Sequence, residues 1–326
     1  MDLWALSDLC TPWCIHTVAT LRIAEHIDSG AREIREIAAA AQCDAYVLGR
    51  ILDHLVTKGV FHQPAPDHYA LNDTSRQLLD NGTRIGLNLE GFGGRMAHSW
   101  STMLGYVRTG VPAYDEIFGR PFWEDLEEHP EIGAQFDALM GPAGHGHPNP
   151  VFPITGAWDA IHTIADIGGG TGAMLAGILK LHPHIKGTLV DQPRTVALSG
   201  PTFAEAAVAD RVTVTGQSFF DPLPAGLDLY LLRGILNDWP DREAIAILKR
   251  CAQAAGTKGR VIVLGGIVPE GRLRPLMIEM ILAGGKHRTT GEFEALAAQA
   301  NLATVIHQTA TGALLAECRR AVSSTA

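Results

Sequence analysis

A glycine-rich segment offers the clearest chemistry in this sequence. It reads ADIGGGTGAML over residues 165–175, with Asp166 ahead of a run of glycines that includes Gly168 and Gly170. Glycine suits such a turn because it adopts positive φ freely and has no Cβ to hold a ligand away from the backbone. About twenty residues further on, Asp191 ends a second apolar run, where a carboxylate can accept both hydroxyls of a ribose. The segment therefore predicts a nucleoside-type cofactor.

Two classes of cofactor fit a loop of this kind. A nicotinamide dinucleotide favours the spacing G-x-G-x-x-G, with its pyrophosphate at a helix N-terminus. The spacing here is G-x-G-x-G behind Asp166, and an acidic residue suits a cofactor that lacks phosphate and carries an amine and a sulfonium. We therefore expect S-adenosylmethionine; the remaining alternative is that the glycines only allow a helix to pack closely.

Strands and helices must alternate around this loop to position it. Apolar runs bounded by turn residues predict five strands, at 162–167, 187–191, 211–215, 227–233 and 260–267. The tail ATVIHQTATGALLAECR holds two apolar runs joined by a Thr/Gly turn, which predicts a terminal hairpin that adds an antiparallel strand. The fold class is therefore α/β, with a Rossmann-like, mostly parallel sheet covered by helices on both faces.

The first 85 residues predict a separate, mainly helical module. Apolar residues recur at helical spacing over 12–27 and 31–60, and the following stretch GVFHQPAPDHYAL predicts a small β-hairpin. Helices followed by such a hairpin form a winged-helix domain, which can serve DNA binding or protein contact. Seven Lys or Arg against eleven Asp or Glu favour protein contact. The predicted domains are 1–85, a helical connector over 86–156 and a cofactor-binding catalytic domain over 157–326.

The overall composition excludes several function classes. The 326 residues carry 26 Lys or Arg and 35 Asp or Glu, and a formal net charge of −9 disfavours nucleic acid or an anionic membrane as partner. No apolar run approaches the roughly 18 residues of a membrane span. Asp2 and Asp8 stand where a secretory signal would be basic, so we expect a cytoplasmic protein.

The five cysteines predict neither a disulfide framework nor a metal site. Their number is odd, they are widely scattered and no CxxC pair occurs. Cys10 and Cys14 stand at helical i, i+4 spacing, and we expect both to pack in a core.

Three longer segments resemble the adenosylmethionine-dependent O-methyltransferases of the plant caffeate and acetylserotonin type, including their bacterial secondary-metabolism members. They are DIGGGTGAMLAGILKLHPHIKGTLVDQPRTV, SFFDPLPAGLDLYLLRGILNDWPDREAIAILKRC and GGKHRTTGEFEALAAQANL. The resemblance runs nearly end to end. It implies a homodimer formed through the winged-helix domain and a pocket for a small-molecule acceptor, to which the connector contributes.

The resemblance also implies which residues touch the cofactor and the acceptor. The cofactor residues would be Asp166, Gly168, Gly170, Asp191, Ser218, Phe219 and Arg233. Among them, the glycines would hold the methionine part, Asp191 the ribose, and Ser218 and Phe219 the adenine, with Arg233 near the carboxylate end. Met140 and Trp100 would line the acceptor pocket; the alternative for both is core packing.

The catalytic positions depart from the family pattern. O-methylating members carry His-Asp-Trp after the fourth strand, where the histidine removes a proton from a phenol as the methyl group arrives. This chain has Asn237, Asp238 and Trp239, and an amide cannot take up a proton at neutral pH. The two carboxylates that position the histidine are matched by Gly265 and His287. We therefore expect Asn237 to orient the acceptor, and His287 to be either a replacement base or a surface residue.

Two reaction classes remain open from the sequence. The intact cofactor loop favours methyl transfer to oxygen, carbon or nitrogen of a small aromatic, indole or polyketide-like natural product, driven by proximity and orientation. The changed catalytic residues favour a scaffold repurposed for cyclisation, isomerisation or hydroxylation, with the cofactor as a charged structural element.

Overall fold

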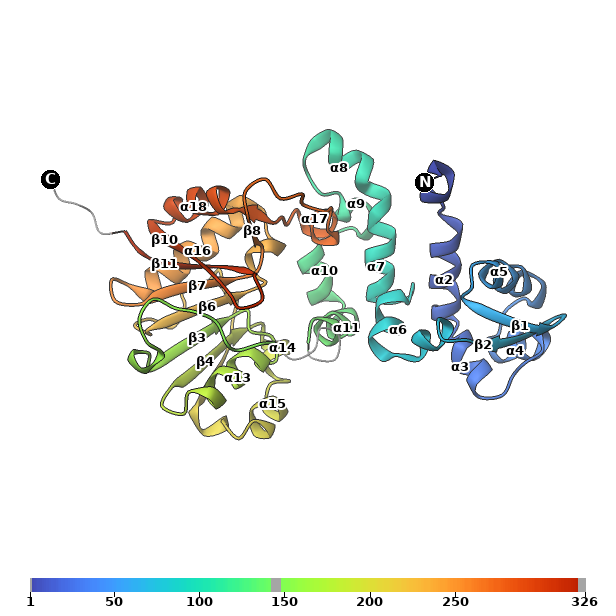
Figure 1. Ribbon diagram of the computed structural model, residues 1–326, viewed down its shortest axis with the longest axis horizontal. Coiled ribbons are helices and arrows are strands. Elements are labelled where there is room, and N and C mark those ends of the chain that lie inside the picture. The colour runs from blue at the N-terminus through green and yellow to red at the C-terminus, as the bar shows by residue number, and fades with distance from the viewer. Residues whose placement is uncertain (1, 142–147, 322–326) are drawn as a thin grey trace. The chain divides into compact units, whose positions relative to one another are not determined.

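A computed structural model describes residues 2–141 and 148–321 of the chain (Figure 1). The chain divides into two units. One comprises Met1–His98 and His129–Leu139, and the other Ser99–Glu128 and Met140–Ala326. The connector predicted over 86–156 thus supplies residues to both units.

The N-terminal unit is built from short helices and one hairpin. Its elements are α1 (Leu3–Leu6), α2 (Cys10–Thr20), α3 (Ile23–Asp28), α4 (Ile34–Ala40), α5 (Ala45–Thr57), β1 (Phe61–Ala65), β2 (His68–Leu71), η1 (Ser75–Leu79), α6 (Asn81–Leu87), most of α7 (Phe92–Ser99) and most of α11 (Pro130–Met140). Asp44 caps α5 by accepting from the Val47 amide, and Glu33 and Glu36 form a capping box at the start of α4. The predicted hairpin is confirmed, because β1 and β2 pair antiparallel.

Apolar stripes of these helices converge on one core. Ile23, Ile27, Leu52 and Leu55 are fully buried there. Cys14 joins this core, but Cys10 is exposed, so the expected burial of both thiols is wrong for Cys10. The physical reason is that Cys10 is the first residue of α2, one turn before the stripe that the other helices cover.

The second unit contains the predicted α/β sheet, which confirms the fold class. Its seven strands lie in the order β10-β11-β7-β6-β3-β4-β5. The bounds are β3 (Thr163–Ile167), β4 (Lys186–Asp191), β5 (Val212–Gly216), β6 (Leu229–Arg233), β7 (Arg260–Leu264), β10 (Leu302–Gln308) and β11 (Leu314–Arg320). Strands β3 to β7 pair in parallel, whereas β11 pairs antiparallel with both β7 and β10. The terminal hairpin is therefore confirmed at the sheet.

One predicted strand is too long. The segment 260–267 leaves the sheet at Leu264, because Gly265 and Gly266 both take positive φ. The chain then forms the short strand β8 (Ile267–Val268), which pairs in parallel with β9 (Arg288–Thr289) instead of extending β7.

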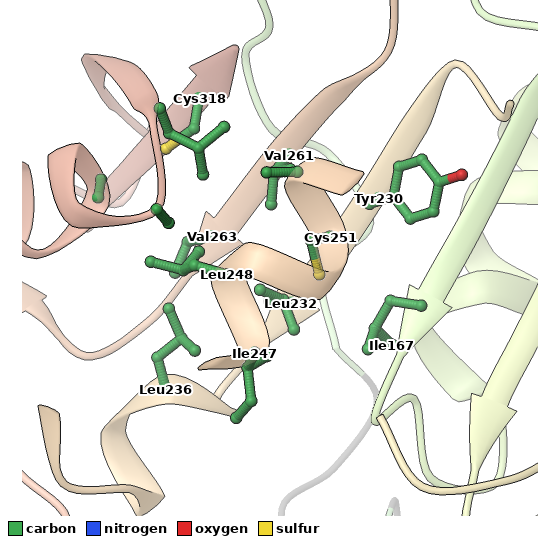
Figure 2. Close-up of a cluster of buried hydrophobic side chains, with 14 of the residues drawn as sticks. Ile167, Tyr230, Leu232, Leu236, Ile247, Leu248, Cys251, Val261, Val263 and Cys318 are labelled. Atoms are coloured by element: carbon green, nitrogen blue, oxygen red, sulfur yellow. The ribbon is translucent and has the colours of Figure 1, made fainter. Parts of the chain in front are cut away.

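Helices cover both faces of the sheet (Figure 1). They are α13 (Ala173–Leu181), α14 (Pro193–Val196) and α15 (Gly200–Glu205) on one face, and α16 (Asp241–Ala255) and α18 (Thr290–Gln299) on the other. Alternate residues of each strand point to opposite faces, so Ile164 packs with α13 while Ile167 packs with the cluster of α16. Figure 2 shows this second cluster, in which Leu248 and Cys251 of α16 lie against the sheet. Each fully buried aliphatic side chain stabilises the fold by ~1.5–3 kcal/mol.

Further helices of the second unit complete the surroundings of the site. They are η2 (Trp100–Thr102), α8 (Met103–Thr109), α9 (Tyr114–Phe118), α10 (Phe122–Glu128), η3 (Trp158–Ala160), η4 (Ala209–Arg211), η5 (Leu236–Asp238) and α17 (Ile278–Ala283). Among these, α17 packs against η2, α9, α10 and η5. Across the part of the chain that the structure describes, no helix is both long enough and apolar enough to cross a bilayer.

Candidate cofactor and acceptor site

The glycine loop follows β3 and leads into α13. Gly168 and Gly172 have positive φ, and a Cβ there would lie 2.4 Å from Ile235 Cδ1 and 2.3 Å from Phe203 Cζ, respectively. Close packing thus requires glycine at these two positions. Gly170 differs, because its φ is +60° yet a Cβ on it would meet no described atom within 4 Å. The backbone of Gly170 therefore borders open space, as a cradle for a ligand requires.

A buried carboxylate lies beneath this loop. Asp166 is 1% exposed, and its Oδ2 atom finds no hydrogen-bond partner among the described residues. Burial raises the pKa of Asp166 to about 7, with the charge of Asp191 adding to the rise and that of Arg233 opposing it. A buried acceptor without a donor is costly, so the arrangement favours a ligand that brings an N–H group. The amine of S-adenosylmethionine fits this requirement.

Asp191 fastens the other side of the loop. Its Oδ2 accepts a hydrogen bond of 2.7 Å from the Gly170 amide, and its Oδ1 accepts one of 2.7 Å from the Gln192 amide. These two bonds hold the carboxylate in place at the end of β4. The structure therefore joins Asp191 to the loop that the sequence analysis paired it with.

An aromatic cluster continues the site beyond the loop. The Phe219 ring lies against the Gly168 backbone and meets Trp239 edge-on, with ring centroids 5.9 Å apart. Ser218 accepts a hydrogen bond from the Phe220 amide, and Arg233 stands exposed at the end of β6. Trp239 also stacks on Trp123 of α10, at 5.2 Å and 16°. Trp239 thus joins the predicted adenine end to the segment that carries Asn237.

The segment η5 holds Asn237 and Asp238 in a tightly packed turn. Asn237 Nδ2 donates to Asp238 Oδ1 at 2.8 Å. A Cβ on Gly266 would lie 2.9 Å from Asn237 Cβ, and one on Gly285 would lie 2.2 Å from the Asn237 carbonyl oxygen. Two later segments therefore close on position 237, and the residue after β7 that faces it is Gly266 rather than Gly265.

Arg288 clamps this turn from both sides, a role that the sequence analysis missed. Its guanidinium is 2% exposed and donates to the carbonyls of Leu236 at 2.7 Å and Trp239 at 2.9 Å, and to Asp241 Oδ1 at 2.9 Å. Because the two carbonyls flank Asn237 and Asp238, Arg288 fixes the backbone from which these two side chains project.

A second carboxylate approaches Asp238. Glu279 lies in the first turn of α17, which packs on η5, and its Oε2 atom is buried without a hydrogen-bond partner in the described ranges. Burial, followed by the charge of Glu279, raises the pKa of Asp238 to about 8. Glu279 belongs to none of the sequence motifs described above. The signal that could have found it is a lone acid in the apolar run MIEMILA.

The other predicted acceptor residues are less tightly placed. The His287 carbonyl accepts from Arg274, but within the described residues no hydrogen bond joins the His287 ring to Asn237. Trp100 begins η2, against which α17 packs, and is 38% exposed. Met140 ends α11 and is 44% exposed. The exposure of both side chains argues against the alternative of core packing.

One group of side chains in the described part of the N-terminal unit has the geometry of metal ligands. Cys10, Cys14 and His54 each place a ligand atom within 4.8 Å of the others. However, the Thr11 hydroxyl binds His54 Nε2 at 2.8 Å, and burial raises the pKa of Cys14 to about 11. One of the two imidazole nitrogens of His54 is therefore engaged in a hydrogen bond.

Comparison with known proteins identifies both units. A model of the O-methyltransferase dimerisation domain matches residues 4–81, and one of the O-methyltransferase domain matches residues 100–303. The chain is 38% identical to 2,7-dihydroxy-5-methyl-1-naphthoate 7-O-methyltransferase from Streptomyces carzinostaticus, over 93% of this chain and 92% of that protein. It is 34% identical to aclacinomycin 10-hydroxylase from Streptomyces purpurascens, over 93% of this chain and 84% of that protein.

A solved structure is similar over almost the whole length. It is an O-methyltransferase from neocarzinostatin biosynthesis, in complex with S-adenosylmethionine and 2-hydroxy-5-methyl naphthoic acid. The TM-score is 0.87 at 36% identity, and the match covers 99% of both chains. Because one family model matches more than half of the chain and these relatives match nearly all of it, the chain is a member of the S-adenosylmethionine-dependent O-methyltransferase family.

Proposed function

We propose that this enzyme transfers a methyl group from S-adenosylmethionine to a hydroxyl group of a small fused-ring aromatic natural product. The observation that carries the proposal is the buried Asp166 carboxylate, whose Oδ2 has no hydrogen-bond partner among the described residues, beside the open backbone of Gly170. The naphthoate specificity of the relatives described above supports the acceptor class.

The residues present would hold the cofactor along the carboxyl ends of β3, β4 and β6. Asp166 would accept from its amine, Asp191 would accept from its ribose hydroxyls, and Phe219 would cover its adenine. Arg233, exposed at the end of β6, would attract its carboxylate. The bound cofactor supplies an electrophilic methyl carbon.

The acceptor would bind where η5 and α17 meet. Asn237 would orient a polar group of the acceptor through its amide, and Trp100 and Met140 would offer apolar surface to a flat ring. Holding the attacking atom in line with the methyl carbon at about 3–3.5 Å supplies much of the acceleration. His287 stays a second candidate for a base at this site.

The test combines binding and turnover. Calorimetry should detect uptake of S-adenosylhomocysteine by the purified chain, and labelled S-adenosylmethionine should transfer label to at least one hydroxynaphthoate or hydroxyanthraquinone. Asp191→Ala should weaken cofactor binding about 10–100-fold, because two charge-assisted hydrogen bonds are lost. An unaltered chain that binds the cofactor but labels none of these acceptors would overturn the proposed acceptor class.

Hydroxylation is the second candidate, favoured by Asn237 in place of the usual histidine and by the 34% identical hydroxylase. Product mass distinguishes the two reactions. Methylation adds about 14 Da, hydroxylation about 16 Da, and a cyclisation or isomerisation leaves the mass unchanged. A product gaining 16 Da would replace the proposed function by the second candidate.

We further infer that the enzyme works as a cytoplasmic homodimer. Large apolar side chains are exposed along α1 and the start of α2, namely Leu3, Trp4, Leu6, Leu9 and Trp13. Such a patch is costly in water, and all of it except Leu3 lies within the segment that matches the dimerisation model. Light scattering should report a dimer, and Trp4→Asp should shift the mass toward the monomer.

A further inference from the structure

We propose that Asp238 and Glu279 together replace the missing histidine base, with Asp238 accepting the proton of the acceptor hydroxyl and Glu279 holding Asp238 ready to do so. This inference rests on the proposed function and assigns the proton transfer within it. We call the two residues the carboxyl pair.

The geometry of the carboxyl pair carries the inference. Glu279 lies in the first turn of α17, which packs directly on η5. Its Oε2 is buried and accepts from no group in the described ranges, while Asp238 Oδ1 accepts from the Asn237 amide. Asn237 is therefore a positioning residue, because its amide orients the Asp238 carboxylate beside it.

The electrostatics of the pair turn an ordinary carboxylate into a usable base. A carboxylate with a pKa near 4 is too weak to take a proton from a phenol whose pKa is near 10. Burial and the negative charge of Glu279 raise the pKa of Asp238 to about 8. That value lies close to the range in which histidine serves other members, so the function of the lost imidazole can be kept without it.

The remaining charged groups near α17 are engaged or exposed. On α9 and α10, the Tyr114 hydroxyl donates to the buried Asp125 at 2.7 Å, whereas Asp115, Glu116 and Glu124 are exposed. Arg288 on β9 gives its hydrogen bonds to the carbonyls around η5 and to Asp241. Burial is the larger cause of the high proton affinity of Asp238, and the charge of Glu279 adds to it.

The proposed step balances in protons and electrons. The acceptor O–H bond breaks and its proton passes to Asp238. The oxygen forms a bond to the methyl carbon, and the electron pair of the broken C–S bond stays on sulfur. One positive charge is lost at sulfur and one proton is gained by the carboxyl pair, so no further co-reactant is needed.

The experiment compares two acceptors that differ only in acidity. One is a hydroxynaphthoate with an un-ionised hydroxyl at the assay pH, and the other is its nitro-substituted analogue, already ionised. Both variants preserve the shape of the side chain: Asp238→Asn removes the base, and Glu279→Gln removes the charge that raises its proton affinity. Both should lower kcat for the un-ionised acceptor about 10²-fold or more, and should leave kcat for the ionised acceptor within a few-fold. Glu294→Gln, an exposed site on α18, is the matched control and should change neither.

A pH profile gives an independent readout. For the un-ionised acceptor, kcat/KM of the unaltered enzyme should rise through about pH 8, and Glu279→Gln should move this rise to lower pH. Affinity for S-adenosylhomocysteine, measured by calorimetry, verifies that each variant is folded. Equal loss with both acceptors, or no loss with either, would overturn the inference. Failure of the unaltered enzyme to methylate any acceptor would instead count against the proposed function.

Discussion

The cofactor side and the acceptor side of the second unit are assembled in different ways. On the cofactor side, Asp166, Gly170 and Asp191 lie at the ends of two adjacent parallel strands, close together in sequence. On the acceptor side, Asp238, Glu279 and Arg288 come from three separate segments spread over fifty residues. The cofactor side can therefore be recognised from the spacing of residues in the sequence, whereas the residues of the acceptor side come together only in the folded chain.

Gly170→Val should abolish cofactor binding, lowering affinity for S-adenosylhomocysteine more than 100-fold. A β-branched side chain would occupy the open space on the loop and would strain a backbone at φ +60°. Gly226→Val is the matched control, because Gly226 also has positive φ and open surroundings but lies elsewhere. Calorimetry with S-adenosylhomocysteine on both variants separates the loss of space on the loop from the effect of backbone strain. Equal losses would mean that backbone strain, not the cradle, decides binding.

Asp166→Asn should stabilise the cofactor-free protein at pH 8 by up to ~4 kcal/mol. The pKa of Asp166 is raised to about 7 in the fold, so its favourable contribution is complete below about pH 4 and is lost as pH rises through 7. The neutral amide avoids this loss. Urea unfolding of the unaltered protein and of Asp166→Asn at pH 4 and pH 8 measures this loss of stability. If the difference in unfolding free energy between the two proteins did not change with pH, the raised pKa of Asp166 would be contradicted.

Arg288→Met should destabilise the unit by ~3 kcal/mol and lower kcat while leaving cofactor affinity nearly unchanged. The change removes the donors to the Leu236 and Trp239 carbonyls, so the turn that carries Asn237 and Asp238 loses its position. Arg272→Met, at an exposed arginine, is the control. Chemical denaturation and steady-state kinetics measure the two effects. If cofactor affinity fell as much as kcat, Arg288 would not act on the acceptor side alone, and this prediction would be wrong.

Trp100→Ala should raise KM for the acceptor about 10-fold without changing affinity for S-adenosylhomocysteine. Trp100 is 38% exposed on η2, which packs against α17, and the loss of its indole from an acceptor contact removes about 1–2 kcal/mol. Kinetics at varied acceptor concentration measure the effect. An unchanged KM would remove Trp100 from the acceptor pocket.

Much of the fold could be predicted because its signals are local. Apolar runs bounded by turn residues indicate the strands β3 to β7, and a Thr and a Glu three residues apart, Thr289 and Glu292, form the capping box that begins α18. The exit of the chain at Gly265 was not predictable, because glycines continue an apolar run without showing that both take positive φ. The exposure of Cys10 likewise depends on which neighbouring helices reach the start of α2.

The site divides in the same way. Asp191 and the glycine loop form a pattern that any reader of the sequence can find, and a hydrogen bond joins them in the fold. Glu279 and Arg288 carry no such pattern. Their importance arises from a helix packing on a turn and from carbonyls that meet a guanidinium, neither of which leaves a fixed spacing in the chain.

The hydrophobic cluster beside α16 contains two cysteines whose alkylation can report local unfolding of the second unit. Cys251 and Cys318 are both fully buried there, and burial raises the pKa of these thiols to about 12 and about 11 (Figure 2). An alkylating reagent cannot reach them while the sheet is closed. Cys10, in contrast, lies exposed on the N-terminal unit. The rate at which Cys251 and Cys318 are alkylated therefore measures how often the centre of the sheet opens, and no residue has to be introduced for this measurement.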